Sequence, residues 1–178
     1  MTRFAGTLSP SNAWPEYPRP QLVRKDWMNL NGLWNYAVRP KNAATPVSSF
    51  DGRILVPYPI ESALSGVGKP VTPEERVWYR RTFELSPEWK NRRLWLRFDA
   101  VDWETAVWVN GISIGRHTGG YDPFAFDITA ALKPSGPQEI VVSAWDPTDQ
   151  GDQPRGKQVL RPRSIWYTPT TGIWQTVW

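Results

Sequence analysis

The stretch Val107–Thr129, VWVNGISIGRHTGGYDPFAFDIT, decides the fold of this chain. Its dipeptide Asn110-Gly111 joins two runs rich in β-branched and aromatic residues, and this dipeptide is typical of a type I′ turn, which needs positive φ at both central residues. We therefore predict a β-hairpin over residues 105–115. A third β-rich run follows the Gly119-Gly120 pair, which we interpret as a backbone turn and not as a phosphate-binding loop, because no G-K-[ST] sequence follows it.

The remainder of the chain repeats this pattern of short strands. Its 18 Pro and 13 Gly are dispersed and leave little room for long helices. The fold class that we predict is all-β, a jelly-roll β-sandwich with two antiparallel sheets. Further strands are expected at residues 32–38, 53–60, 77–85, 92–100, 122–129, 138–146 and 172–178.

Local features refine this pattern. Pro57 should end the strand at 53–60 or place it at an edge, because proline cannot donate to a β-ladder. In the strand at 92–100, Leu94, Leu96 and Phe98 should lie on one face and Trp95 and Arg97 on the other, and one face of the strand should be wet or partly wet. The segment 127–136 has room for one helical turn, with Asp127 or Thr129 as its cap.

Length and composition limit the function classes. The 178 residues suit one domain, with residues 1–31 as a Pro-rich approach segment. A net charge of +4 with scattered Lys and Arg argues against nucleic acid as a partner, and no apolar run is long enough for a membrane span. No signal peptide pattern is visible, and the localisation stays open. The absence of Cys excludes disulfides and thiolate chemistry.

The 12 Trp are more than a core of this size requires. Flat aromatic rings can stack on the C–H face of a pyranose while neighbouring polar groups bind its hydroxyls. We assign Trp34, Trp95, Trp108 and Trp174 to the core or to sheet faces. The candidates for carbohydrate contact lie in loops or at strand ends and are Trp166, Tyr167, Gln158, Trp103, Tyr121 and His117, the last being either a sugar contact or a turn residue bonded to backbone.

Catalytic and metal-binding groups are not evident. A retaining glycosidase needs two carboxyl groups on either side of the scissile bond, and the chain offers no credible pair. We interpret Asp99 and Asp102 as solvated or turn-capping residues at a strand end. The carboxylates of Asp146, Asp149 and Asp152 permit a calcium hypothesis, but a solvated polar loop is favoured. We therefore predict no catalytic residue, no metal and no cofactor in this chain.

Several motifs occur together in a familiar order: LNGLW, ILVPYPIES, VWYRRTFEL, the run from LRFDAVDWETAVWVNG to DPFAFDIT, and GIWQTVW. The chain resembles the N-terminal sugar-binding domain of glycoside hydrolase family 2, the family of β-galactosidases and β-glucuronidases, whose jelly roll is similar to galactose-binding domains. The resemblance implies that an immunoglobulin-like domain and a (β/α)8 barrel follow in the parent protein and that the barrel supplies both catalytic glutamates. We find neither module in these residues and expect an excised module or a fragment.

The resemblance also bears on single residues. In many family members a loop just before the Gly-Ile strand carries an acidic residue that contacts the substrate, and here Trp166 stands at that position relative to Gly172. A second contact region follows the Val-Pro pair, where Glu61 is either a polar contact or a plain loop residue. These departures leave the sugar and the linkage open.

Three functions follow from these observations. The first is a non-catalytic carbohydrate-binding-type domain that shapes the active-site entrance of a retaining exo-glycosidase, with a carbohydrate or glycoside and the other domains of the parent as partners. The second is a self-standing, lectin-like module. The third is a structural module that packs between domains and has no sugar affinity. In each case the chain alone is expected to be inactive, whereas its parent is expected to be a glycoside hydrolase.

Overall fold

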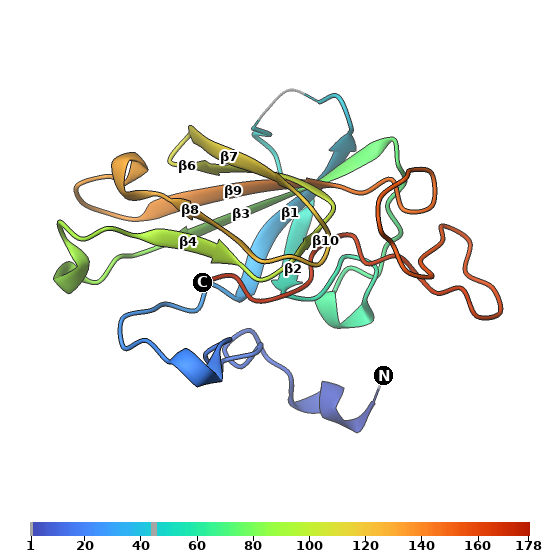
Figure 1. Cartoon of the computed structure of the whole chain (residues 1–178), viewed down its shortest axis with the longest axis horizontal. Coiled ribbons are helices and arrows are strands. Elements are labelled where there is room, and N and C mark those ends of the chain that lie inside the picture. The colour runs from blue at the N-terminus through green and yellow to red at the C-terminus, as the bar shows by residue number, and fades with distance from the viewer. Residues whose placement is uncertain (1, 44–45) are drawn as a thin grey trace.

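The computed structural model describes residues 2–43 and 46–178, and its strands form two antiparallel layers (Figure 1). The larger layer is a six-stranded sheet in the order β2-β1-β3-β9-β6-β7, in which every neighbouring pair is antiparallel. Its strands are β1 (Gly32–Pro40), β2 (Gly52–Val56), β3 (Glu75–Phe83), β6 (Glu104–Val109), β7 (Ile112–Thr118) and β9 (Gln138–Trp145). β2 ends directly before Pro57, as predicted.

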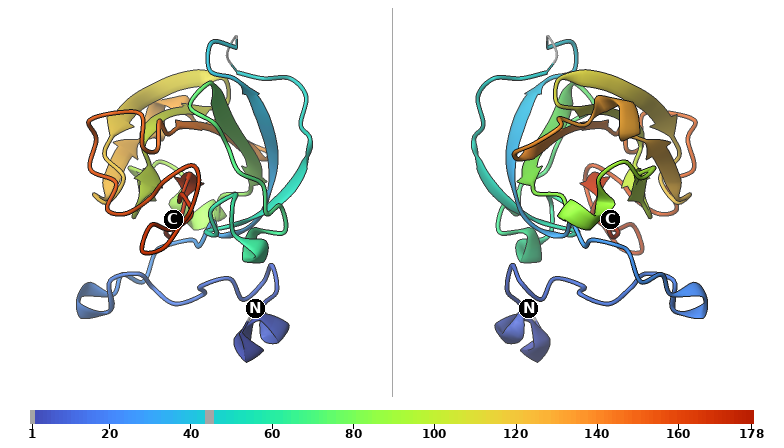
Figure 2. Two further views of the ribbon diagram at one scale, coloured as in Figure 1. Left: turned by 90° about the vertical axis from the view of Figure 1, so that its right-hand side faces the viewer. Right: turned by 90° about the vertical axis from the view of Figure 1, so that its left-hand side faces the viewer.

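The second layer consists of two short ladders. β4 (Trp95–Phe98) pairs with β8 (Phe124–Asp127), and β5 (Val101–Asp102) pairs with β10 (Gly172–Ile173). The C-terminal residues extend β10 along β4, since the Arg97 and Trp178 backbones exchange hydrogen bonds of 2.7 and 2.9 Å. Figure 2 shows the large sheet curved over this layer. The all-β, antiparallel class predicted from the sequence is confirmed.

The Asn110-Gly111 turn joins β6 and β7 as expected. The two residues have φ of 50° and 81°, the positive values that a type I′ turn needs. The predicted helical turn is present as the 3₁₀ helix η5 (Thr129–Ala131), but the predicted cap is wrong, because Ile128 and not Asp127 or Thr129 is the N-cap residue. The Asp127 carboxylate accepts a hydrogen bond from the Thr129 N–H at 3.0 Å. The other 3₁₀ helices are η1 (Arg3–Thr7), η2 (Pro20–Leu22), η3 (Ala63–Ser65) and η4 (Pro87–Trp89).

The core lies between the two layers. Strand alternation directs Trp34 of β1, Tyr79 of β3 and Phe98 of β4 into it, and none of the three is exposed to solvent. On the opposite face of β4, Trp95 is 46% exposed. The predicted alternation of this strand, with one partly wet face, is therefore confirmed.

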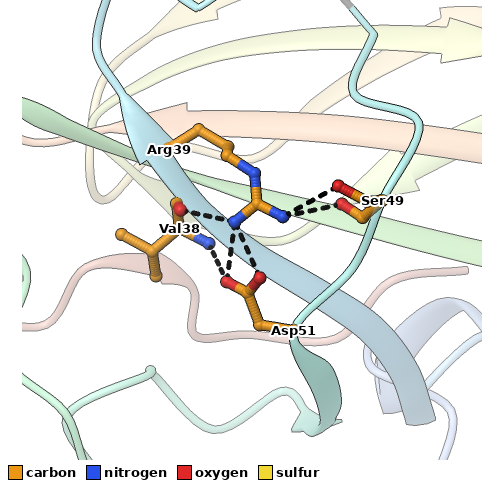
Figure 3. A network of polar contacts seen from close by, with 4 residues as sticks. All are labelled: Val38, Arg39, Ser49 and Asp51. Carbon is orange, nitrogen blue, oxygen red and sulfur yellow. Dashed lines mark hydrogen bonds and ion pairs between the residues drawn. The ribbon is translucent and has the colours of Figure 1, made fainter.

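A smaller apolar cluster covers the outer face of the large sheet. Trp78 is fully buried there against Trp108, with ring centroids 5.6 Å apart, and Val47 and Phe50 pack over the cluster. Figure 3 shows how this covering segment is attached to β1. Arg39 binds the Asp51 carboxylate at 2.7 Å and the Ser49 carbonyl at 3.0 Å, while the Val38 N–H donates to Asp51 at 2.9 Å.

The N-terminal segment passes along the second layer. Its Met1 lies outside the described residues. Asn31 fixes the end of this segment, because its side chain donates to the Ala13 carbonyl at 3.2 Å and accepts from the Val177 N–H at 3.0 Å. Within ranges 2–43 and 46–178, no helix combines the length and apolar character needed to cross a bilayer.

The Asn110 side chain offers a test of the hairpin. It donates to the Ala131 carbonyl and to Gln138 Oε1, both at 2.8 Å, and accepts from the Glu139 N–H at 2.9 Å. Asn110→Gly keeps the positive φ but leaves the Ala131 carbonyl and the Glu139 N–H without these hydrogen bonds, while Gln138 Oε1 still accepts from the Lys133 N–H. We therefore expect a loss of about 2–3 kcal/mol in unfolding free energy, measured by urea titration.

Asn91→Gly is the matched control, because Asn91 also has positive φ, 65°, and is exposed. We expect this variant to change the stability by less than about 0.5 kcal/mol. Similar losses in both variants would mean that the Asn110 hydrogen bonds do not stabilise the hairpin.

Candidate functional site

Residues 146–171, between β9 and β10, form a long loop at one end of the sandwich, which we call the site loop (Figure 1). Asp146 connects its two ends. This carboxylate accepts hydrogen bonds from the Thr148 N–H at 2.7 Å, near the start of the loop, and from the Thr171 hydroxyl at 3.2 Å, at its end. The loop is thus closed at its base by one buried side chain.

Gln158 attaches the middle of the site loop to the sandwich. Its amide nitrogen lies 3.4 Å from both Asp102 Oδ2 and the Tyr121 hydroxyl, and its amide oxygen accepts from the Thr170 N–H. The Gln158 side chain is buried, with 4% of the residue exposed. A single amide therefore connects β5, the turn after β7 and two parts of the loop.

Three carboxyl groups lie beneath the site loop, and we call Glu61, Asp102 and Asp146 the carboxylate cluster. Asp102 and Asp146 are each 3% exposed, and Glu61 accepts from the Thr171 N–H at 3.0 Å. One oxygen of Glu61 and one of Asp102 are buried without a hydrogen-bond partner. The solvated roles expected for Asp102 and Asp146 are therefore wrong, because both side chains point into the protein.

Burial governs the protonation of this cluster. Burial, with a contribution from the negative charge of Asp146, raises the pKa of Glu61 to about 7 and the pKa of Asp102 to about 7. Burial also raises the pKa of Asp146. Close carboxyl groups in a low-dielectric site keep protons that exposed ones would lose, so near neutral pH the cluster is partly protonated.

Glycine allows the backbone to approach the cluster closely. A Cβ atom on Gly120 would lie 2.5 Å from Asp102 Oδ1, and a Cβ on Gly172, whose φ is +87°, would collide with the Tyr79 hydroxyl. A larger residue at position 120 would displace Asp102, which Gln158 contacts, and one at position 172 would displace Tyr79 of β3. Among the described residues, no three His, Cys, Asp or Glu side chains are arranged to hold a metal ion.

Two tyrosines lie above Gln158. Tyr121 and Tyr167 are 49% and 51% exposed, and the Tyr167 hydroxyl accepts from the Lys157 N–H at 3.1 Å. Gly156 lies between them, where a Cβ would be 2.7 Å from the Tyr167 hydroxyl and 3.8 Å from that of Tyr121. The structure thus brings together Gln158, Tyr121 and Tyr167, which the sequence singled out separately.

Trp166 lies on the outer part of the loop. Its side chain is 38% exposed and lines a pocket of about 520 Å³. The pocket also contains Asp149 and three cationic side chains, those of Arg155, Arg161 and Arg163. An aromatic face, an acid and several guanidinium groups therefore border one hollow.

The other candidates lie elsewhere. His117 stacks on Phe124 with ring centroids 4.1 Å apart, and burial lowers its pKa. Trp103 lines a separate pocket of about 420 Å³ together with Trp145. In the described part of the chain, no hydrogen bond or ring contact joins His117 or Trp103 to Tyr121 or Tyr167.

Sequence reasoning missed Asp102 and Asp146 as members of the site. Neither residue lies in a sequence motif that would distinguish a buried carboxylate from a solvated carboxylate that caps a turn. Their environment is created by residues distant in the chain, since Gln158 reaches Asp102 and Thr171 reaches Asp146 only after the sandwich has closed.

The Glu61 carboxyl group predicts a pH dependence of stability. Its pKa is raised on folding, so the folded protein binds the extra proton between pH 4.5 and about 7, and the unfolding free energy falls as pH rises through this window. Glu61→Gln keeps an acceptor for the Thr171 N–H and cannot ionise. We expect it to be more stable than the native chain at pH 8, by on the order of 1–3 kcal/mol, with little difference at pH 4.5.

The comparison is made by urea titration at both pH values. Glu84→Gln, which alters an exposed glutamate, serves as the control and should match the native chain at each pH. Equal stability of Glu61→Gln and the native chain at pH 8 would show that Glu61 is not buried as described.

Known proteins with related sequences are glycosidases. The chain is 24% identical over 131 residues to a protein named beta-glucuronidase from Paenibacillus borealis, and the match covers 71% of this chain and 22% of that protein. It is 31% identical over 101 residues to a beta-galactosidase from Thermoanaerobacter pseudethanolicus, covering 57% of this chain and 13% of the relative. The chain thus spans about a fifth or less of the length of these relatives.

A solved structure and a family model also relate the chain to glycosidases. The crystal structure of Ruminococcus gnavus beta-glucuronidase matches 70% of this chain and 22% of its own with a TM-score of 0.58 and 23% identity, which shows a shared fold. The model of the family described as "Glycosyl hydrolases family 2, sugar binding domain" matches residues 53–169, more than half of the chain. The resemblance expected from the ordered motifs is confirmed, and the chain belongs to the sugar-binding domain family of family 2 glycosyl hydrolases.

Proposed function

We propose that this chain is a non-catalytic, carbohydrate-contacting domain that forms one wall of the active-site entrance of a retaining exo-glycosidase. The relatives named beta-glucuronidase and beta-galactosidase support a β-glycoside as the substrate class. Because the chain spans a small part of their length, we place the bond-cleaving carboxylates in another part of a longer protein. That part is the partner of this domain.

The environment of the acidic residues supports a non-catalytic role. A retaining glycosidase holds its nucleophile and its acid/base roughly 5 Å apart on either side of the scissile bond, where the sugar can reach both. Asp102 and Asp146 are 3% exposed and are engaged beneath the site loop. A pyranose cannot be inserted between them without dismantling the loop.

The main support for the proposal comes from the exposed aromatic residues of the site loop and of the turn after β7. Trp166, Tyr167 and Tyr121 present between 38% and 51% of their surface to solvent on a segment that buried side chains hold in place. An exposed aromatic face next to guanidinium groups suits a sugar, because the ring packs on C–H groups while the cations bind hydroxyl or carboxylate oxygens. The pocket volume of about 520 Å³ is in the range of ligand sites.

The remaining candidate residues have other roles in this proposal. Gln158 and Glu61 are positioning residues, because their side chains face the interior and hold the loop that carries the aromatic rings. Trp103 and His117 lie outside this group and stay sequence-based predictions of sugar contact.

Trp166 offers the test. In the protein that joins this chain to its catalytic part, Trp166→Ala should lower kcat/KM on an aryl β-glucuronide or β-galactoside by about tenfold to a hundredfold, equivalent to about 1–3 kcal/mol, because a stacking surface is lost. The melting temperature should change little, since the ring is 38% exposed.

Ile165→Ala is the matched control. Ile165 precedes Trp166, is 62% exposed and does not line the pocket. We expect unchanged kcat/KM for this variant and no hydrolysis by the 178-residue chain alone. Equal losses in both variants, or no loss in Trp166→Ala, would refute the contact, and hydrolysis by the isolated chain would refute the non-catalytic role.

A further inference from the structure

A further hollow lies between β4, η4 and the N-terminal segment, and its lining reaches the core residues Leu30, Leu96 and Ile128. Its volume is about 440 Å³, and the indole rings of Trp27, Trp89, Trp95 and Trp178 form much of its wall. We call it the Trp/Arg cleft. It has no lining residue in common with the pocket beside Trp166.

The lining of the cleft is strongly positive. It contains five cationic side chains and one acidic side chain, that of Asp26. The lining therefore has a net charge of +4, which equals the net charge of the whole chain although few of its residues line the cleft. The cations are those of Arg24, Lys25, Arg92, Arg93 and Arg97.

These cations have few anionic partners within the protein. Arg92 binds Asp26 at 2.9 Å and Arg93 binds Asp127 at 2.8 Å, but the two arginine side chains are 53% and 72% exposed, so both ion pairs are weak and exchangeable. Across the described ranges, Arg24, Lys25 and Arg97 form no ion pair.

Arg97 is the focus of the positive charge. Burial and the nearby charges of Arg24 and Arg19 lower the pKa of its guanidinium, and the acid beside it, Asp99, already accepts from Trp178 Nε1 at 3.1 Å. An anion bound in the cleft would relieve this repulsion.

The aromatic wall adds a stacking surface. Trp95 is 46% exposed on the outer face of β4, and the Arg93 guanidinium lies 5.4 Å from its ring centroid. Two other indoles of the lining, those of Trp27 and Trp178, contact each other and Tyr17 edge to face at 5.0 to 6.4 Å. A pyranose could lie on Trp95 with a ring substituent directed at the arginines.

We propose that the Trp/Arg cleft binds an acidic oligosaccharide whose sugars carry carboxylate groups, that is, one built of uronic acid units. Aromatic faces select the ring, and guanidinium groups bind carboxylates in a bidentate manner. A neutral sugar would gain the stacking but would leave the cations without partners. The site is independent of the site loop and therefore goes beyond the proposed function.

Calorimetric titration of the 178-residue chain with a galacturonic acid hexamer at low salt tests this site, with a neutral galactose hexamer as the comparison ligand. The acidic hexamer should bind saturably and at least about tenfold more tightly than the neutral one, and its affinity should fall as NaCl is added. Trp95→Ala and the double variant Arg92→Gln, Arg93→Gln should each weaken binding about tenfold or more, whereas Trp95→Phe should retain most of it.

Phe4→Ala is the matched control, because Phe4 is also an exposed ring, 69% accessible, beneath an arginine, Arg3 at 4.9 Å, but lies outside the cleft. It should bind like the native chain. Absence of saturable binding, equal affinity for the neutral hexamer, or unchanged affinity in Trp95→Ala would overturn the proposal. Because Trp166 is intact in every variant, these outcomes are separate from those that test the proposed function.

Discussion

The hydrogen bonds of the buried Gln158 amide are the constraint on which the exposed surface of this protein depends. Backbone pairing within the site loop is limited to short bridges at Gln158–Tyr167 and Arg163–Trp166, and ordering each residue costs about 1–2 kcal/mol of conformational entropy. Gln158 contacts Asp102, Tyr121 and Thr170 from a single side chain, and Asp146 closes the loop at Thr148 and Thr171. The loop is therefore held by side chains at its base and its middle.

This arrangement places acidic groups in an unusual environment. Burial of a carboxylate is unfavourable unless it is paired, and no cation faces the cluster in the described structure. The cluster accommodates its charges by keeping protons to near pH 7, as the raised pKa values of Glu61 and Asp102 indicate. Two of the carboxyl groups beneath the loop therefore titrate near pH 7, and Gln158 and Thr171 connect these groups to the loop.

Much of the fold could be predicted from the sequence because its signals are local. The Asn110-Gly111 turn, the alternation of Trp95 with Leu96 and the stop at Pro57 each depend on neighbouring residues and the chemistry of the backbone. The site was predictable only in part. Exposed aromatic residues in the loop follow from composition, but the burial of Asp102 and Asp146 depends on contacts between residues 25 to 56 positions apart.

The two hollows show how one sandwich can present different surfaces. The hollow at the site loop combines the Trp166 ring with Asp149 and three arginines, whereas the Trp/Arg cleft gathers indoles and guanidinium groups beside β4 and the N-terminal segment. Five of the 12 tryptophans line these two hollows. The sandwich supplies the rigidity, and the loops and the outer strand face supply the chemistry.

Amide hydrogen exchange, resolved by NMR at single residues, tests most directly whether the site loop is held as described. The N–H groups of Thr170 and Thr171 donate to Gln158 and Glu61. They should exchange at least about a hundredfold more slowly than an unstructured peptide, comparable with the amides of β9. If both amides exchange at the rate of an unstructured peptide while the β9 amides stay protected, the site loop is not pre-formed. That result would contradict the claim that buried side chains hold its exposed aromatic residues in place.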